Sequence, residues 1–225
     1  MSHLPRPWLC LVTDRSLVAP EARTPAAELA ALERWLDEAL NADLDLIQLR
    51  ERDLDARALA QLARGLVERR AARRVRLLVN DRADVALAAG ADGVHLRADG
   101  PPVPAVRALS SSRWMVGRSV HTLDEIREHA TADYLLFGTV FPGGSKGDAV
   151  RTQGLDALAR AAAASAVPLL AIGGVTPERS AAVVAAGAAG VAAIGAFLPA
   201  GRHPGALGPV RAAETFRAAM DRVGS

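Results

Sequence analysis

Short runs of apolar residues alternate with longer amphipathic stretches along the whole chain. The apolar runs have the length of buried strands, and they lack the polar alternation of a sheet that has one face in water. The stretches between them carry apolar residues at helical spacing, as in residues 25–40 with Leu29, Leu32, Leu36 and Leu40. The pattern therefore predicts strands covered on the outside by helices, which is typical of a parallel α/β sheet.

Taken in order, the pattern predicts eight strand–helix units. The predicted strands are residues 8–13, 44–50, 75–79, 92–96, a segment that starts at 114–116 and ends near 117–119, 134–137, 169–172 and 190–194. The predicted helices are residues 25–40, 56–70, 85–89, 103–109, 123–129, 155–164, 177–186 and 210–223. We therefore predict an α/β fold, a single-domain (β/α)8 TIM barrel over residues 1–225, with a doubly wound open sheet as the alternative.

The composition narrows the class of protein. Half of the 225 residues are hydrophobic, which is enough for one large core. The 27 basic and 25 acidic side chains are interspersed, so we expect no nucleic-acid partner. No apolar run reaches transmembrane length and no hydrophobic signal core is visible, so we expect no membrane partner and a cytoplasmic location. The one cysteine, Cys10, is expected to be a small core residue.

Residues 169–178 join a predicted strand to a predicted helix start. The strand ends at Gly173 and Gly174, and Thr176 and Pro177 then have the residue types of an N-cap and a first helical position. Glycines let the backbone approach a ligand, and a helix N-terminus favours a phosphate. A second strand end closed by glycine follows at residues 190–196, so two adjacent strand ends could hold one phosphate. The alternative is a tight turn alone.

Polar side chains gather at the predicted strand ends, where a barrel has its active site. Gln48, Arg50 and Arg52 alternate, so they face one side if the strand continues, and together they suit an anion and a ring edge. The alternative is a solvated strand end with Arg50–Glu51 and Arg52–Asp53 pairs. The other polar strand ends are Thr13, Asp14, Asn80, Asp81, His95, Arg118, Ser119, His121, Gly138 and Thr139.

At three of these strand ends the residues need a separate interpretation. Asn80 and Asp81 could bind a metal or a polar ligand, or could cap the following helix. His95 is expected at the edge of the core. His121 precedes a capping-box pattern, where an imidazole suits proton transfer, and the alternative is a surface histidine in a turn. No set of histidine and acidic residues has a metal-ligand spacing.

The predicted loop 141–154 is long for a connection between a strand and a helix, which makes it a candidate lid. It carries Lys146, the one lysine of a chain that otherwise uses arginine. A lysine retained in such a composition is a candidate ligand-binding residue.

Seven motifs together resemble those of the thiamin phosphate synthase/TenI superfamily, small barrels of thiamin biosynthesis. They are QLRERD (48–53), VND (79–81), ADGVHL (91–96), GRSVHT (117–122), ADYLLFGTVFP (132–142), SKG (145–147) and AIGGVTPE (171–178). The resemblance runs over nearly the whole chain. It implies a thiazole phosphate substrate with its phosphate at Gly173, Gly174, Ile194 and Gly195.

The superfamily holds two activities. The synthase joins an aminopyrimidine diphosphate to a thiazole phosphate with Mg²⁺ and releases pyrophosphate. Its pattern has one magnesium-binding Asp matched here by Asp81, and a second where this chain has Gly100, with Asp99 one position earlier. Gly143 stands where the synthase loop has threonine, and Arg52 stands where it has lysine.

The GRSVH motif followed by LFGTVF looks like the TenI-like branch. We therefore expect a thiazole tautomerase, an isomerase that aromatises a thiazole carboxylate phosphate by proton transfer, without a metal or other cofactor. The resemblance makes His121 its acid/base, and we expect Lys146 and Arg118 to neutralise the carboxylate or to close the lid over it. The other residues expected to bind substrate are Gln48, Arg50, Arg52, Asn80, Ser119 and Thr139.

Two alternatives stay open at this point. One is a magnesium-dependent thiamin phosphate synthase with Asp81, and Asp99 if the loop absorbs the shift, on the metal. The other is a regulatory barrel that binds thiamin-related phosphates without turnover. A homo-oligomer is compatible with each of the three.

Overall fold

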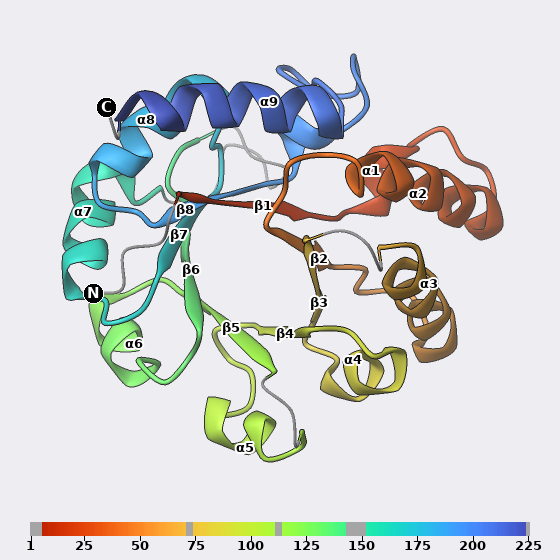
Figure 1. The fold of residues 1–225 in the computed structure, drawn as a ribbon, viewed down its shortest axis with the longest axis horizontal. Coiled ribbons are helices and arrows are strands. Elements are labelled where there is room, and N and C mark those ends of the chain that lie inside the picture. The colour runs from red at the N-terminus through yellow and green to blue at the C-terminus, as the bar shows by residue number, and fades with distance from the viewer. Residues whose placement is uncertain (1–5, 71–73, 111–113, 143–151, 224–225) are drawn as a thin grey trace.

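Eight parallel strands close into a barrel with helices around it (Figure 1). The computed structural model describes residues 6–70, 74–110, 114–142 and 152–223. Neighbouring strands in the sequence are neighbours in the sheet, and the last strand pairs with the first through the register Leu9–Val191. The predicted (β/α)8 barrel is therefore confirmed, and the closure rules out the open sheet.

The described elements follow the predicted order with small shifts at their ends. The strands are β1 (Trp8–Val12), β2 (Leu46–Leu49), β3 (Arg76–Asn80), β4 (Gly93–Leu96), β5 (Met115–Val120), β6 (Tyr134–Gly138), β7 (Leu169–Ile172) and β8 (Gly190–Ala193). The helices are α1 (Arg15–Val18), α2 (Pro25–Ala39), α3 (Ala56–Arg69), α4 (Ala83–Ala89), α5 (Val103–Arg107), α6 (Leu123–Glu128), α7 (Gly154–Ala164), α8 (Pro177–Ala185) and α9 (Pro209–Met220), with 3₁₀ turns η1 (Gly195–Phe197) and η2 (Asp221–Val223). The turns α1 and η1 were not predicted, because a single turn is too short to show helical periodicity.

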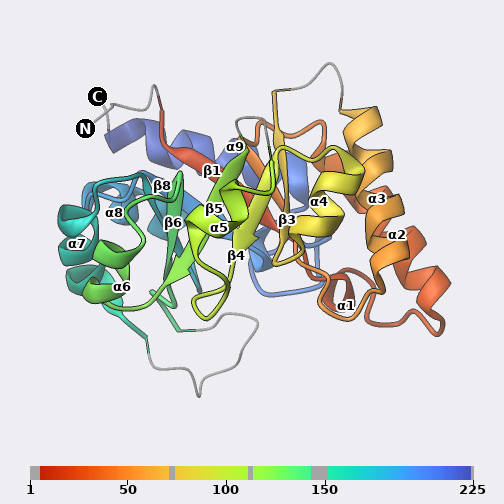
Figure 2. The same ribbon diagram turned by 90° about the horizontal axis from the view of Figure 1, so that it is seen from below.

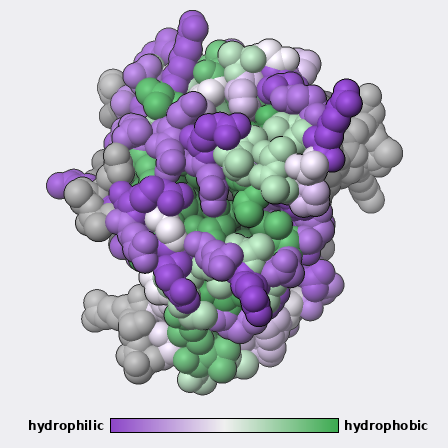
Figure 3. Space-filling model, turned by 90° about the vertical axis from the view of Figure 1, so that its right-hand side faces the viewer, coloured by the Kyte–Doolittle hydropathy of each residue, from purple (hydrophilic) through white to green (hydrophobic). Residues whose placement is uncertain are grey.

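The side view places the strands in the middle, with α2 and α3 on one side and α6, α7 and α8 on the other (Figure 2). Helix α3 turns Leu59, Leu62, Ala63 and Leu66 toward the strands. The face that carries α2 and α3 is covered mostly by hydrophilic side chains, with smaller apolar patches among them (Figure 3). Amphipathic helices thus cover the outside of the barrel, as the sequence pattern predicts.

Alternation along each strand separates two cores. On β1, Leu9 and Leu11 belong to the large cluster between strands and helices, whereas Cys10 and Val12 belong to the cluster inside the barrel. The prediction that Cys10 is a small core residue is confirmed, and burial raises the pKa of its thiol. The inner cluster fills the lower part of the barrel, so the free space lies at its carboxyl end.

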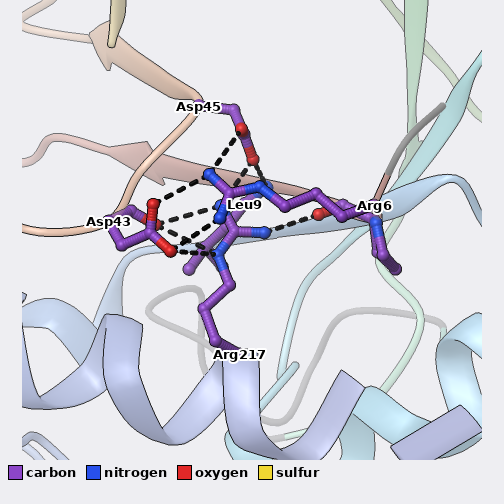
Figure 4. Close-up of polar contacts among 6 residues, drawn as sticks. Arg6, Leu9, Asp43, Asp45 and Arg217 are labelled. Atoms are coloured by element: carbon purple, nitrogen blue, oxygen red, sulfur yellow. Dashed lines mark hydrogen bonds and ion pairs between the residues drawn. The ribbon is translucent and has the colours of Figure 1, made fainter. Parts of the chain in front are cut away.

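An ion-pair network at the amino ends of the strands ties α9 to β1 and β2 (Figure 4). Arg217 on α9 donates to Asp45 at 2.6 Å, and the same carboxylate accepts the backbone N–H of Leu9 at 2.8 Å. Arg6 donates to Asp43 at 2.7 and 2.8 Å. The network joins segments from both ends of the chain, so we expect it to stabilise the closure of the barrel.

The same device recurs at two further strands. Asp92, just before β4, accepts the backbone N–H of Leu77 at 2.7 Å. Asp133, just before β6, accepts that of Val116 at 2.6 Å. With Asp45 before β2, a carboxylate therefore satisfies a backbone donor at the start of β1, β3 and β5, which pins the register of alternate strands.

We expect Asp45→Asn to lower the free energy of unfolding by about 2 kcal/mol. The Arg217 side chain is 9% exposed and that of Asp45 is 21% exposed, so the substitution leaves a largely buried guanidinium without its closest charge partner. Urea denaturation measures the change. Asp124→Asn is the matched control, because Asp124 is 94% exposed in its pair with Arg127 and should cost nothing measurable. Equal losses in both variants would contradict the assignment.

Within the part of the chain that the structure describes, no helix is long and apolar enough to cross a membrane.

Candidate functional site

A cavity of about 260 Å³ opens at the carboxyl ends of the strands. Its walls come from residues of β1 to β7 and from the segments that follow the strands, including Ile194 just after β8. The lining includes Val12, Gln48, Arg50, Arg52, Asn80, His95, Arg97, Asp99, Ser119, His121, Gly138, Thr139, Ile172, Gly173 and Ile194. The structure thus brings together most of the residues that the sequence selected at separate strand ends.

Gln48 at the end of β2 presents a buried acceptor to this cavity. The side chain is 2% exposed, and its Nε2 donates to Asn80 Oδ1 at 2.8 Å. Asn80 Nδ2 in turn donates to Asp81 Oδ2 at 2.9 Å. Gln48 Oε1 is buried and has no hydrogen-bond partner among the described residues. A buried unpaired acceptor is costly, so this oxygen is suited to a donor on a ligand.

Arg50 and Arg52 put positive charge on the same wall. Arg50 is 18% exposed at its side chain, and its Nη1 lies 3.6 Å from Asp14 Oδ2. Burial and the nearby charge of Arg52 lower the pKa of Arg50. Because the charge of the exposed Arg52 acts on the largely buried Arg50, an anion bound beside both would relieve that repulsion.

The acidic neighbours of these arginines face away from the cavity. Glu51 accepts from the Thr13 hydroxyl and the backbone N–H of Arg15, and burial raises its pKa. Asp53 pairs with the Arg15 guanidinium, at 2.7 Å through Nη2. Arg15 therefore takes both carboxylates, so the alternative pairing of Arg50 with Glu51 and Arg52 with Asp53 is not what the described residues adopt.

His95 on β4 lines the cavity and belongs to a buried hydrogen-bond chain. Its Nδ1 is 2.9 Å from Tyr134 Oη, and its Nε2 is 2.9 Å from Ser119 Oγ. Burial lowers the pKa of His95 to about 3, so the ring is neutral at physiological pH. The expected core-edge position of His95 is confirmed. These hydrogen bonds fix the Ser119 hydroxyl at the cavity.

The buried His95 should make stability depend on pH. The folded pKa is about 3 and the unfolded value is about 6.5, so between these values only the unfolded state gains a proton. The free energy of unfolding is then complete above pH ~6.5 and falls as the pH is lowered. Between pH 7 and pH 5 we expect wild type to lose about 2 kcal/mol more than His95→Gln does in urea denaturation. Parallel pH curves for the two proteins would refute this assignment.

His121 follows β5, and its position fits both interpretations of it, a residue in the turn before α6 and a side chain at the cavity. Its backbone N–H donates to Glu125 in the capping box of α6, and its ring lines the cavity. The ring Nδ1 lies 2.6 Å from the Gly138 carbonyl oxygen. A carbonyl oxygen only accepts, so Nδ1 carries a proton and donates it to this oxygen.

The predicted metal ligands Asp81 and Asp99 both contact one arginine. Arg97 Nε lies 2.9 Å from Asp81 Oδ2 and 3.4 Å from Asp99 Oδ1, and the Arg97 backbone N–H donates to Asp81 Oδ1 at 2.8 Å. The described residues contain no group of three or more His, Cys, Asp or Glu side chains that could hold a metal ion. Sequence reasoning missed Arg97, because the loop after β4 sets the direction of its side chain and the sequence of that loop has no periodic pattern.

Arg118 does not line the cavity. Its guanidinium donates to the carbonyl oxygens of Pro101 at 2.6 Å, Ala98 at 2.7 Å and Gly100 at 3.1 Å. It therefore supports the loop after β4 and faces away from Ser119, its neighbour on the strand, which corrects the expectation that it contacts substrate. The other residue expected at the carboxylate, Lys146, lies outside the described residues.

The four residues expected at the phosphate line one small recess of about 70 Å³ between the ends of β7 and β8: Gly173, Gly174, Ile194 and Gly195. Gly173 and Gly174 have φ angles of +95° and +61°. A Cβ on Gly174 would lie 2.6 Å from the carbonyl oxygens of Phe141 and Pro142, so only glycine fits there. Thr176 and Pro177 begin α8 as predicted.

The recess opens into the cavity, since Gly173 and Ile194 line both. His203, on the segment after η1, also lines the recess. The sequence offered no signal for His203, because this segment has neither periodicity nor a motif. Together, an arginine wall on β2 and a glycine-lined recess at β7 and β8 give one cavity two places for anions.

Comparison with known proteins gives the chain its relatives. Residues 9–197 match the family described as thiamine monophosphate synthase. A thiamine-phosphate synthase of Chlorobium luteolum is 37% identical over 217 residues, which cover 96% of this chain and 93% of that protein. One of Moorella thermoacetica is 42% identical over 162 residues, covering 71% of this chain and 77% of that protein.

Solved structures agree with these relatives. Thiamine phosphate pyrophosphorylase from Pyrococcus furiosus superposes with a TM-score of 0.78 and 28% identity, covering 97% of each chain. A 3-hexulose-6-phosphate synthase reaches a TM-score of 0.65 at 22% identity, which shows the shared barrel alone.

These findings correct the expected activity. The expectation of a thiazole tautomerase, an isomerase, is wrong, because the similar proteins are named as thiamine-phosphate synthases, which are transferases. The motif GRSVH that suggested the TenI-like branch surrounds Ser119 and the capping box at His121, and both have structural duties that do not depend on proton transfer.

Proposed function

The chain belongs to the thiamine monophosphate synthase family, and we propose that it acts as a thiamine-phosphate synthase. In this reaction a carbon–nitrogen bond joins an aminopyrimidine to a thiazole phosphate while the carbon–oxygen bond to the pyrimidine's diphosphate breaks. Both substrates carry anionic groups, and the pyrophosphate leaves with additional charge. The observation that carries the proposal is the single cavity with anion-binding features at two places, on β2 and at β7–β8.

The glycine-lined recess suits the thiazole phosphate. Gly173, Gly174 and Gly195 leave space for phosphate oxygens close to the backbone, and the N-terminus of α8 contributes partial positive charge. The recess holds few charges of its own among its lining residues, so its selectivity for phosphate comes from backbone N–H groups and shape. The thiazole ring would then extend from the recess past Ile194 into the main cavity.

The amide of Gln48 suits the aminopyrimidine. Its buried Oε1 lacks a partner among the described residues, and its Nε2 is held by Asn80, so the oxygen is fixed in orientation. An exocyclic amino group supplies the missing donor. The Ser119 hydroxyl, fixed by His95, offers a second polar contact to a ring in the same cavity.

The arginine wall suits the diphosphate. Arg50 and Arg52 lie two and four residues after Gln48 and line the same cavity, so a pyrimidine at Gln48 would direct its diphosphate toward them. Charge grows on the pyrophosphate as the carbon–oxygen bond breaks. Guanidiniums preorganised in a partly buried wall stabilise that charge more strongly in the transition state than in the bound substrate.

Divalent metal chemistry, which the resemblance implies for synthases, does not fit the donor set. Of the carboxylates expected to bind the metal, the described residues offer Asp81 and Asp99, and both already contact Arg97. Asp81 also accepts from Asn80 and from the Arg97 backbone, which uses three of its acceptor sites. At the position of the second expected carboxylate, Gly100 has no side chain.

Growth of a thiamine auxotroph tests the proposal. A bacterial strain that lacks its own thiamine-phosphate synthase should grow without thiamine when it expresses this chain. Growth should be lost with Arg50→Met and retained with Arg64→Met, an exposed arginine on α3 that donates to the Ala88 carbonyl. Failure of the wild-type chain to support growth, despite folded protein in the cells, would contradict the proposed function.

A further inference from the structure

Arg97 lies where the acidic groups at the mouth of the barrel converge. It follows β4 directly and lines the main cavity together with Asp99. Its Nε is within 3.4 Å of carboxylate oxygens from both Asp81 and Asp99, which come from the ends of different strands. One guanidinium therefore supplies the positive charge that bridges these two carboxylates.

Backbone and side-chain contacts around Asp81 fix the orientation of its carboxylate. Asp81 has a φ angle of +58°, and its own N–H donates to the His95 carbonyl at 2.8 Å. Its Oδ1 accepts the Arg97 backbone N–H, while its Oδ2 accepts from Asn80 and contacts Arg97 Nε. The carboxylate is thus oriented by three donors, and its charge is compensated by an arginine already in place.

Arg97 also has donors left for a second anion. A guanidinium has five N–H donors in a planar fork, more than two carboxylate contacts require. Arg97 lines the same cavity as Arg50 and Arg52, and with Arg52 it lines an adjoining cavity of about 210 Å³. Burial, and after it the nearby charge of Arg52, lower the pKa of Arg50, so this wall brings two cations close to each other.

We infer that Arg97 takes the place of a divalent cation at this site, and that the chain binds the diphosphate of its substrate directly through Arg97, Arg50 and Arg52, without a metal. The identity of the diphosphate as a substrate rests on the proposed function. The binding of inorganic pyrophosphate and the exclusion of the metal by Arg97 do not.

In the loop after β4, Gly100 stands at the position of the second expected carboxylate and has no side chain to bind a metal. Gly100 donates its N–H to the Arg97 carbonyl at 3.0 Å and accepts from Arg118 at 3.1 Å. A Cβ built on Gly100 would lie 3.2 Å from the Arg97 carbonyl oxygen, a contact that a small adjustment relieves. A carboxylate can therefore be returned to this position, which makes the inference testable in both directions.

Equilibrium binding tests it without turnover. Calorimetry with inorganic pyrophosphate should give affinities within about twofold of each other in EDTA and in excess Mg²⁺ for wild type. Arg97→Ala should weaken pyrophosphate binding in EDTA by about tenfold or more, because it removes a charge-assisted donor. Arg127→Ala is the control, since Arg127 pairs with Asp124 on α6 and does not line the cavity. Arg97 is 54% exposed at its side chain, so its removal should leave the thermal midpoint nearly unchanged.

Manganese binding tests the second part of the inference, the exclusion of a metal by Arg97. Binding is measured as the loss of the free Mn²⁺ signal in electron paramagnetic resonance. Wild type should leave the signal unchanged, whereas Arg97→Gly combined with Gly100→Asp should take up Mn²⁺, because it frees Asp81 and adds a carboxylate. Stoichiometric Mn²⁺ uptake by wild type would overturn the inference. So would a wild-type affinity for pyrophosphate that is about tenfold or more lower in EDTA than in excess Mg²⁺. Product formation that requires Mg²⁺ would also overturn it and leave the proposed function intact, whereas metal-independent pyrophosphate binding without product would do the reverse.

Discussion

Replacing Arg50 with methionine is expected to lower the rate of thiamine phosphate formation by about 100-fold or more. Arg50 lines the cavity at the end of β2, and its side chain is 18% exposed, so little water screens its charge. Methionine keeps the length of the side chain and removes the cation. Because the charge of the pyrophosphate grows as it leaves, the loss should fall mainly on kcat.

Arg64→Met is the matched control for this result. Arg64 lies on α3 and donates to the Ala88 carbonyl at 3.1 Å, away from the cavity. Steady-state kinetics with both substrates separate kcat from KM. A rate for Arg50→Met within about threefold of the Arg64→Met rate would remove Arg50 from the diphosphate site.

Gly174→Ala is expected to weaken the binding of thiazole phosphate by about 30-fold or more, because the added methyl group collides with neighbouring backbone and displaces a residue that lines the recess. The Cβ would lie 2.6 Å from the Phe141 and Pro142 carbonyl oxygens, so either Gly174, which lines the recess, or the backbone at Phe141 and Pro142 must move. Gly174 also has a φ of +61°, which alanine adopts only with strain. Calorimetric titration with thiazole phosphate measures the loss.

Gly90→Ala separates backbone strain from the clash. Gly90 ends α4 at a φ of +69°, and a Cβ there meets nothing within 4 Å. Both variants should lose thermal stability through strain, but only Gly174→Ala should lose affinity. If thiazole phosphate bound equally well to the two variants, the recess would not be its phosphate site.

The closed barrel was predictable because periodic patterns of apolar residues along the chain determine its strands and helices. Runs such as residues 169–172 are fully apolar, and helices such as α2 carry leucines at helical spacing, so pattern alone predicts a parallel sheet covered by helices. The aspartates before β2, β4 and β6 were not singled out. Their role became visible only when the structure showed Asp45, Asp92 and Asp133 each accepting a backbone N–H from the adjacent strand.

The site was predictable where the strand end itself sets the direction of a side chain. Gln48 and Arg50 face the cavity because alternation along β2 continues beyond Leu49. Arg118 was misplaced although the same rule applies. Val116 and Val120 pack on the outer cluster and Met115 in the barrel, so parity puts Arg118 outside and Ser119 inside.

Loop residues were beyond prediction because contacts distant in sequence decide their positions. Arg97 reaches Asp81 only because Asp81 adopts a left-handed backbone conformation, which its residue type permits but does not require. The choice of reaction failed for a related reason. His121 and its motif fit a turn before α6 as well as they fit proton transfer, so the motif alone could not separate the two branches.

The most direct test of the central claim is the stoichiometry of the purified chain with an aminopyrimidine diphosphate and a thiazole phosphate. We expect one pyrophosphate to be released for each thiamine phosphate formed, with both products quantified by chromatography and mass spectrometry. No pyrophosphate should be released when the thiazole phosphate is omitted. Absence of thiamine phosphate from folded protein that binds both substrates would contradict the account.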